Sequence, residues 1–368
     1  MLLGACLDHP LKAVEYDKSE EAENTVAIAI NKDVDILFVI DNSGSMGEEQ
    51  QLLSENFASF INVLEAKDVQ ANYRIGITTT DAGNPRCPTA TYKPEGGNLV
   101  LSSCLDRIEQ NEFKFGEDDF SAACTSKCTK RDADLTVRGT TTAYDMNEVP
   151  RKWIERIETE SNIQGVDSNV EAFQCYGPQG VAGCGFESHL ESMYLALANA
   201  TSSASKNNYG FLREAAILSI VFITDEADCS YNPLTKEIFT TNKVFWKSPD
   251  DPAPTSSLCW KAGVECTGGP GTYSECHSQN YDVTGAVTTD PTKMALQPVS
   301  KYIDFVKSIE AEKQLIDESQ NVLVSLIAGV PKGYEDLQAE IPYEDSADTM
   351  LQGNFGIGPG CVLDAGTA

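Results

Sequence analysis

Residues 34–46, VDILFVIDNSGSM, decide the fold that this sequence predicts. The stretch starts as a short apolar run rich in β-branched residues and breaks abruptly at Asp41. Such a run is typical of a strand that is buried on both faces near the centre of a parallel sheet. At its carboxyl end, Asp41, Ser43 and Ser45 occupy alternate positions, and Gly44 permits a tight backbone path between the two serines.

The residues after this loop predict a helix over residues 48–67, because six apolar side chains fall on one stripe: Leu52, Leu53, Phe57, Phe60, Ile61 and Leu64. Asp41 and the two serines therefore belong to a strand-to-helix loop, where open α/β sheets bind their ligands. Hard oxygen donors without nitrogen or sulfur suit Mg²⁺, Ca²⁺ or Mn²⁺. The alternative is a polar loop that only caps the helix, where Asp and Ser are common.

The loop resembles the metal-ion-dependent adhesion site (MIDAS) of von Willebrand factor type A (VWA) domains, whose pattern is Asp-x-Ser-x-Ser after the first strand. Asp41, Ser43 and Ser45 match that pattern residue for residue. The resemblance implies an α/β fold with a Rossmann-like, doubly wound and mostly parallel sheet. It also implies a bound divalent cation, with magnesium as the first expectation.

The order of apolar segments along the chain agrees with that expectation. Central strands are predicted at residues 34–40, 73–80, 216–224 and 322–330, and helices at residues 153–163, 186–203 and 299–318. Strands that alternate with helices are typical of a parallel sheet. We therefore expect a tether at residues 1–33, a VWA domain at 34–330 with irregular insertions at about 84–150 and 229–298, and an extension at 331–368. Short extended segments are expected at residues 25–30, 98–102 and 135–137.

Two further loops complete the expected site. In the resembled family a Thr at the start of a helix and an Asp after the fourth long strand join the metal loop. Asp225 follows the strand at 216–224 and matches the latter, although a salt-bridged loop acid is the alternative; Glu226 and Asp228 are expected to be solvated acids at the rim.

The expected Thr is absent from this sequence. Glu187 or Ser188 stands near its place, and Glu187 can instead be an acid favoured by the dipole at a helix N-terminus. If Glu187 binds the cation, its charge weakens the attraction of the cation for an acid from outside.

Charge and cysteine usage narrow the class of protein. A net charge of −29 over 368 residues argues against nucleic acid or anionic lipid as a direct ligand. Twelve cysteines indicate an oxidising compartment, and disulfides are favoured over zinc because the chain has three histidines and no paired CxxC units. The spacing of Cys124 and Cys128 is the one feature that favours zinc.

Cysteine pairing is expected between neighbours in the sequence. Those pairs are Cys87–Cys104, Cys124–Cys128, Cys175–Cys184 and Cys266–Cys276, which leaves Cys229, Cys259 and Cys361 without an assigned partner. If Cys6 carries a lipid, an odd number of cysteines remains, and one thiol is free or pairs with another chain.

The first residues predict where the protein is located in the cell. Leu3-Gly4-Ala5-Cys6 resembles the bacterial lipobox, in which the cysteine is lipidated, although a chance match of four residues is the alternative. Five residues are too few for a signal peptide, so we expect the true precursor to begin earlier. Leu7 follows Cys6 where Asp is associated with inner-membrane retention, which favours a lipid anchor in the outer membrane of a bacterial envelope. No apolar run reaches the ~20 residues needed to span a bilayer.

The leading expectation for function is a binding module that grips an acidic side chain of another protein through its divalent cation. The alternative is a structural subunit of an envelope assembly, in which the metal site is permanently filled and the protein forms oligomers or larger complexes. An enzyme is not expected, because the sequence lacks GxSxG, HEXXH and P-loop motifs and because His9, His189 and His277 stand isolated.

Overall fold

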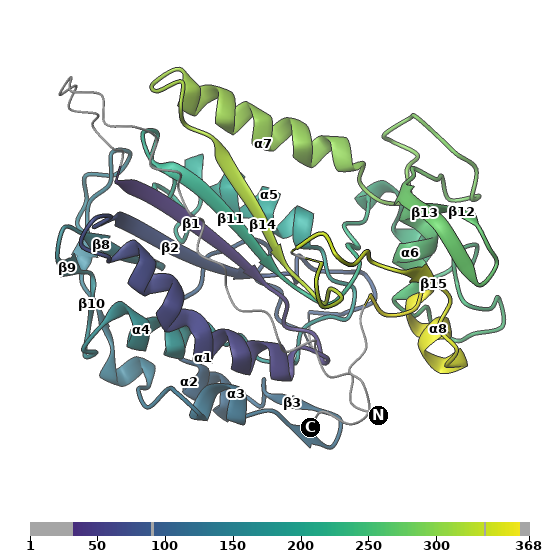
Figure 1. Cartoon of the computed structure of the whole chain (residues 1–368), viewed down its shortest axis with the longest axis horizontal. Coiled ribbons are helices and arrows are strands. Elements are labelled where there is room, and N and C mark those ends of the chain that lie inside the picture. The colour runs from purple at the N-terminus through teal and green to yellow at the C-terminus, as the bar shows by residue number, and fades with distance from the viewer. Residues whose placement is uncertain (1–31, 90–91, 335, 361–368) are drawn as a thin grey trace.

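The computed structural model describes residues 32–89, 92–334 and 336–360 (Figure 1). Cys6, Cys361 and the extended segment expected at residues 25–30 lie outside these ranges. Within them, no helix is both long enough and apolar enough to cross a membrane.

A six-stranded sheet forms the centre of the molecule, in the order β14-β11-β1-β2-β8-β9 (Figure 1). Four strands run parallel: β1 (Asp33–Ile40), β2 (Asn72–Thr79), β11 (Ile217–Ile223) and β14 (Val322–Ile327). Two antiparallel strands, β8 (Trp153–Ile157) and β9 (Glu160–Ser161), extend the sheet beyond β2. The expected α/β class with a mostly parallel sheet is therefore confirmed, and the four apolar runs of the sequence form its parallel strands.

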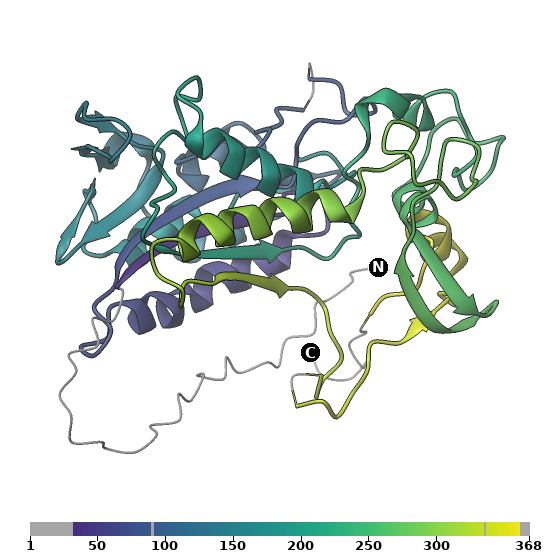
Figure 2. The same cartoon turned by 90° about the horizontal axis from the view of Figure 1, so that it is seen from above.

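Helices cover both faces of the sheet because β1 is apolar on both sides. Ile36, Phe38 and Ile40 pack in the core under α1 (Gly47–Leu64) and α4 (Asn169–Tyr176). Leu37 and Val39 point to the opposite core, which α5 (His189–Thr201) and α7 (Val299–Gln314) cover. Figure 2 shows α5 and α7 together on one side of the sheet and α1 on the other.

Three aromatic rings fix α1 to the sheet. Phe57 of α1 stacks on Phe173 of α4, and Phe38 of β1 meets both rings at steep angles. All three side chains are almost completely buried. Because α1 follows the Asp41 loop directly, this contact also sets the position of that loop at the end of β1.

The helix predicted over residues 153–163 is wrong. Trp153 begins β8, which pairs with β2 so that Trp153 lies opposite Gly76. Glu155 forms a buried ion pair with Arg74 of β2, and the Trp153 ring lies beneath the Arg74 guanidinium at 5.4 Å. The apolar residues of this segment are spaced for either structure, and pairing with β2 selects the strand.

The first insertion contains short elements and contributes cysteines to three disulfides. Its helices are α2 (Cys104–Glu109), α3 (Ala122–Thr125) and η1 (Asp132–Asp134). Its strands are β3 (Lys114–Phe115), β4 (Asp118–Asp119), β5 (Thr136–Val137), β6 (Gly139–Thr140) and β7 (Val149–Pro150). Strand β10 (Ile163–Gln164), which follows β9 in the chain, pairs with β5. The extended segment expected at 135–137 appears as β5. The one expected at 98–102 forms no strand, although Val100 N donates to Ile77 O at 2.9 Å.

The second insertion and the C-terminal extension together form a second region beside the sheet (Figure 1). Its elements are η2 (Pro233–Phe239), α6 (Ser257–Gly263), β12 (Val264–Gly268), β13 (Thr272–Ser278), β15 (Tyr343–Glu344) and α8 (Thr349–Phe355). A separate core that includes Phe239, Trp246 and Leu258 supports it. Strand β15 of the extension pairs with β13 of the insertion, so the two segments share one sheet.

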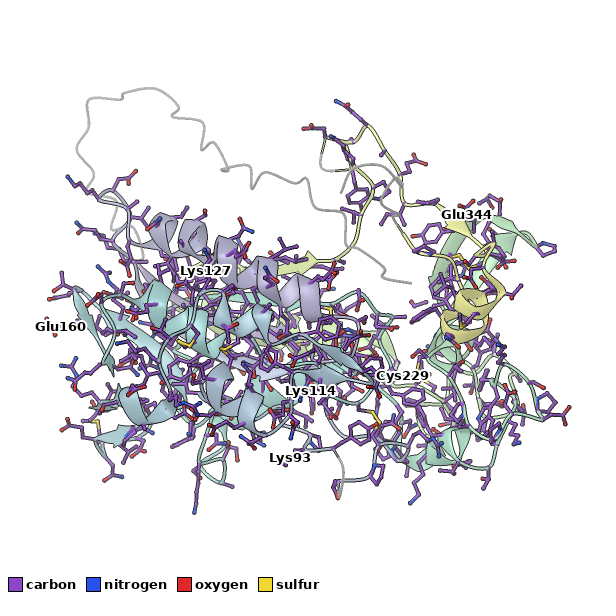
Figure 3. All side chains as sticks on the ribbon, turned by 90° about the horizontal axis from the view of Figure 1, so that it is seen from below. Lys93, Lys114, Lys127, Glu160, Cys229 and Glu344 are labelled. Carbon is purple, nitrogen blue, oxygen red and sulfur yellow. A yellow bond between two sulfur atoms is a disulfide. The ribbon has the colours of Figure 1, made fainter. Side chains whose placement is uncertain are left out.

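Five disulfides are present among the described residues: Cys87–Cys184, Cys104–Cys124, Cys128–Cys175, Cys229–Cys259 and Cys266–Cys276. The expected pair Cys266–Cys276 is confirmed, because the β12–β13 hairpin places these two residues opposite each other. The other three expected pairs are wrong, since the fold brings cysteines distant in sequence together. Cys229, labelled in Figure 3, lies where the chain leaves the sheet for the second region.

The cysteines that the sequence left open as zinc ligands lie close together. The sulfur atoms of Cys104, Cys124 and Cys128 are within 4.8 Å of one another. All three are in disulfides, so they offer no thiolate to a metal. Their role in this structure is to tie α2, α3 and α4 together under α1.

The Phe57 contact can be tested directly. Phe57→Ala should lower the free energy of unfolding by about 3–5 kcal/mol, because a fully buried ring is replaced by a cavity. Urea unfolding of the metal-free protein measures the change. Val63→Ala, on the same helix at a side chain 62% exposed, should stay within about 0.5 kcal/mol of the parent. Equal effects of the two substitutions would contradict the proposed role of the ring.

Candidate metal centre

The two acids that the sequence singled out lie just beyond the carboxyl ends of neighbouring strands. Asp41 follows β1 and Asp225 follows β11, and Asp41 N donates to Ile223 O at 2.9 Å. Ser45 Oγ donates to Asp225 Oδ1 at 3.2 Å, and the hydroxyl oxygens of Ser43 and Ser45 are 3.3 Å apart. Four of the five predicted site residues are thus joined by hydrogen bonds or by the pairing of their strands.

Asp41 is fully buried, and its carboxylate is oriented from three sides. Oδ1 accepts a hydrogen bond from Ser43 N at 2.8 Å and lies 3.5 Å from Thr80 Oγ1. Oδ2 accepts from Thr224 Oγ1 at 2.7 Å. Because Thr80 and Thr224 terminate the strands on either side of β1, the sheet itself fixes the direction of this carboxylate.

Gln50 locks the Asp41 loop to the loop before α5. Its side-chain nitrogen donates to Asp41 O and to Gly180 O, both at 2.7 Å. Its side-chain oxygen accepts from Gln179 N at 2.7 Å and from Gly180 N at 3.0 Å. Gln50 is fully buried, so these bonds replace hydration that the two loops cannot obtain from water.

Glu187 is the predicted site residue whose surroundings are most unusual. The residue is 1% exposed, and its Oε1 has no hydrogen-bond partner among the described residues. Burial, followed by the charges of Asp41, Glu226 and Asp225, raises the pKa of this carboxyl well above its usual value. A buried carboxylate without a partner is costly unless a cation or a proton neutralises it.

Ser188 is the other residue that the sequence offered in place of the family Thr. Its hydroxyl donates to Cys229 O at 3.2 Å, and its backbone N–H donates to Thr80 O at 2.9 Å. Those bonds link the start of α5 to β2 and to the loop after β11. Glu187 therefore has the free oxygen, whereas Ser188 has a structural partner.

Further carboxylates crowd the same end of the sheet. Partial removal from water and the charge of Asp41 raise the pKa of Asp225 to about 6. Burial and the charges of Asp225, Glu48 and Asp41 raise the pKa of Glu49 to about 7. Burial and the Asp225 charge likewise raise the pKa of Glu226, which was expected to be a solvated rim acid. Acids that raise one another's pKa mark a strongly negative site that a divalent cation would stabilise.

His189 is not isolated, contrary to the expectation from sequence. Its Nε2 lies 2.5 Å from Thr224 Oγ1 and its Nδ1 lies 3.5 Å from Asp228 Oδ1. Because the Thr224 hydroxyl donates its single proton to Asp41, the His189 Nε2 must donate to Thr224. His189 thus stabilises the position of Asp41 indirectly, through the Thr224 hydroxyl. Its position as the first residue of α5, just after Glu187, was the available sequence signal.

These residues fit a divalent cation that binds oxygen. Asp41, Ser43, Ser45, Glu187 and Asp225 supply oxygen alone, the donor type preferred by Mg²⁺ and Ca²⁺. Apart from the disulfide-bonded cysteines, the described residues contain no group of three acids or histidines whose ligand atoms converge within 4.8 Å. Asp41, Glu187 and Asp225 therefore do not converge as three carboxylates on one point, and a cation bound here would also need the serine hydroxyls and water as ligands.

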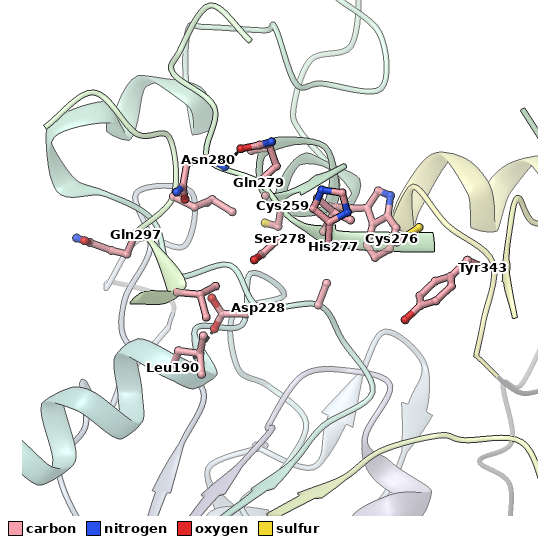
Figure 4. A pocket seen from close by; sticks show the side chains of 17 residues that line it. Leu190, Asp228, Cys259, Cys276, His277, Ser278, Gln279, Asn280, Gln297 and Tyr343 are labelled. Carbon is pink, nitrogen blue, oxygen red and sulfur yellow. Dashed lines mark hydrogen bonds between the residues drawn. The ribbon is translucent and has the colours of Figure 1, made fainter. Parts of the chain in front are cut away.

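A cleft of about 290 Å³ adjoins this site. Asp228 and Leu190 line one side of it, and residues of the second region, among them Trp260, His277 and Tyr343, line the other. Figure 4 shows Asp228 and Leu190 apart from His277, Ser278 and Gln279 across the opening. Asp228 lies three residues after Asp225, so the loop after β11 connects the candidate site to a cleft that the second region helps to form.

Comparison with known proteins adds little to this geometry. No known family matches the sequence, and no curated protein matches it. One similar solved structure is that of the pilus adhesin RrgA from Streptococcus pneumoniae, with 9% sequence identity and a TM-score of 0.23. The likeness covers 62% of this chain and 23% of the adhesin chain. At that distance it carries no argument, so the site rests on its own geometry.

The acid cluster predicts how stability depends on pH. The pKa values of Asp225, Glu49 and Glu187 are higher in the folded protein than their usual values near 4, so the folded chain binds more protons than the unfolded chain. The contribution of these three acids to the free energy of unfolding of the metal-free protein should therefore be most favourable below about pH 4 to 5. That contribution should be lost as the pH rises through about 6 to 7.

Chemical unfolding across that pH range, with chelator present, measures this dependence. Glu187→Gln should flatten the fall in stability, since it removes one of the buried acids. Glu160→Gln, at an exposed position in β9, is the matched control and should leave the slope unchanged. A slope that Glu187→Gln does not alter would mean that Glu187 takes no part in the cluster.

Proposed function

We propose that this chain is a VWA-type module, with a doubly wound Rossmann-like sheet, that binds another protein through a divalent cation. Asp41, Ser43, Ser45 and Asp225 would hold the cation in the manner of a MIDAS, with Mg²⁺ the first expectation and Ca²⁺ or Mn²⁺ as alternatives. The cation would supply an electrophilic centre for an acidic side chain of the partner.

The observation that carries this proposal is the difference between the inner and outer sides of the site. Asp41 and Ser43 are buried, whereas Ser45 and Asp225 are exposed. A cation held between them would face solvent on the side of Ser45 and Asp225, where a carboxylate from outside can approach. The adjoining cleft gives the second region a place to contact the same partner.

Glu187 favours a second candidate, a structural subunit of an envelope assembly. A fully buried carboxylate with a free oxygen can complete the coordination of the cation from within. Its charge would lower the affinity of the cation for an external acid and hold the metal permanently. In that case the surfaces of the insertions, and not the metal, would bind neighbouring subunits.

The proposal includes no catalytic step and places the protein in the envelope of a bacterium. It assigns His189 a supporting role, because this residue contacts Thr224 and Asp228. Five disulfides support an oxidising compartment. Lipidation of Cys6 with an outer-membrane anchor remains part of the proposal, and nucleic acid is not a proposed ligand.

Titration with metal alone tests the site itself. Calorimetry with Mg²⁺, Ca²⁺ and Mn²⁺ should detect binding to the parent, and Asp41→Asn should weaken it at least about tenfold, because one direct ligand loses its charge. Asn keeps the size of the side chain and can still accept from Ser43 N through its oxygen, whereas its amide nitrogen cannot accept from the Thr224 hydroxyl. Glu160→Gln serves as the control. Unchanged metal affinity in Asp41→Asn would reject the site.

A second measurement separates the adhesion proposal from the structural one. In the Mn²⁺-loaded protein, water-proton relaxation should reveal an exchangeable water on the cation if an external ligand position exists. Capture of envelope proteins should then be lost on addition of EDTA and in Asp41→Asn. A cation without exchangeable water, together with capture that survives EDTA, would select the structural subunit and reject adhesion.

A further inference from the structure

Strand β14 is exposed in a way that its sequence does not predict. Its residues, VLVSLI, form the apolar run typical of a strand buried on both faces. In the structure β14 is the outer strand beside β11, and four of its side chains are at least half exposed: Leu323 (53%), Val324 (56%), Leu326 (64%) and Ile327 (50%). Leu323 and Ile327 lie on one face and Val324 and Leu326 on the other, so apolar side chains are half exposed on both faces of the strand.

Among the described residues, no strand pairs with the outer edge of β14. Thr224 N donates to Ile327 O at 3.2 Å, so the peptide groups of Ile327 point toward β11. Alternation along the strand then directs the N–H and C=O groups of Val324 and Leu326 outward. No charged residue, bulge or proline within the strand blocks this edge. Edges of this kind are templates for pairing with another strand.

We propose that β14 is a homodimer interface, in which it pairs antiparallel with β14 of a second copy about a two-fold axis at Ser325. The exposed residues are symmetric about that position. The pairing sets Leu323 against Ile327 of the partner copy and Val324 against Leu326 of the partner copy, while Ser325 meets Ser325. Each exposed apolar side chain thereby contacts another one on the same face of a continuous sheet.

The hydrogen-bonding pattern selects the same register. In an antiparallel pair, directly opposite residues alternate between hydrogen-bonded pairs and non-hydrogen-bonded pairs. Val324 and Leu326 have the outward peptide groups, and in this register they face each other and exchange both bonds. Val322 N already donates to Glu310 Oε1 at 3.1 Å, so the free edge begins just after it. Ser325 falls in a non-hydrogen-bonded pair, where the Cα atoms lie about 4.5 Å apart.

Charge favours a second copy at this surface despite the acidity of the chain. Residues 319–331 contain no charged side chain, whereas the whole chain has a net charge of −29. Two copies can therefore approach along β14 with less repulsion than an acidic face would cause. The exposed apolar area, on the order of a few hundred square ångströms, is comparable with the largest apolar patch of a typical monomer, which is often functional. This inference does not depend on the metal site.

Sedimentation velocity of the full chain tests the proposal. The parent should sediment as a dimer at micromolar concentration and dissociate on dilution. Ser325→Lys should give a monomer, since it places two like charges directly opposite each other at the axis. Val63→Lys, at an exposed position of α1, should remain dimeric, and so should Asp41→Asn. Circular dichroism and thermal melts confirm that each variant is folded.

Cross-linking tests the register without relying on a destabilising variant. Ser325→Cys should form a covalent dimer on mild oxidation, because the two Cα atoms are within the range of a disulfide. Val324→Cys is the matched control and should not form a covalent dimer. In the proposed register Val324 lies opposite Leu326 of the second copy, so the two Val324 positions are about two residues apart along the strand. Hydrogen exchange of the parent should show the Val324 and Leu326 amides protected in the dimer and exposed on dilution.

Three outcomes would overturn the proposal. One is a parent chain that stays monomeric at every concentration, and another is a dimer that survives Ser325→Lys. The third is equal cross-linking of the two cysteine variants. If such a monomer also has protected Val324 and Leu326 amides, another segment of the same chain covers the edge.

Discussion

The parallel pairing of β1 with β11 is the constraint on which the rest of the structure depends. Its register sets Ile40 opposite Ile223, so the two strands end at the same level, and Asp41 and Asp225 follow within two residues of that edge. Parallel strands share this edge by construction, whereas antiparallel neighbours would place the two acids at opposite ends of the sheet. Burial of β1 on both faces makes the register hard to shift, because a slip by one residue would reverse every side chain.

That arrangement places several carboxylates at the buried carboxyl edge of the sheet, where water hydrates them least. Asp41 is compensated by hydrogen bonds from Thr224 and Ser43, and Thr224 is held in turn by His189. Glu187 has no such compensation at Oε1. A buried carboxylate without a partner is costly, and this cost is why Glu187 belongs to the proposed cation site.

The insertions determine what surrounds the site. Cys87–Cys184 joins the loop after β2 to the loop before α5, and Cys229–Cys259 anchors the second region directly after the Asp225 loop. The second region has its own core and opens a cleft toward Asp228. Loops at the carboxyl ends of strands commonly carry specificity, and here disulfides give them the rigidity that a surface loop lacks.

Several features could be deduced from the sequence alone because they depend on local pattern. The apolar run before Asp41, the alternation of strands and helices and the positions of Asp41, Ser43, Ser45 and Asp225 all follow from residue type and spacing. Hydrophobic periodicity reports which faces are buried, and parallel strands carry their loops to one edge. The sequence also located Glu187, but gave no reason to prefer it to Ser188.

Only the tertiary structure decided the features that depend on distant partners. Cys104, Cys124, Cys128 and Cys175 pair as they do because three helices pack together under α1, and Trp153 lies in a strand because β2 offers it an edge. His189 reaches Thr224 through the fold, and the β14 run lies at an edge although its composition is that of an interior strand. Sequence spacing measures distance along the chain, whereas these contacts are set by packing across it.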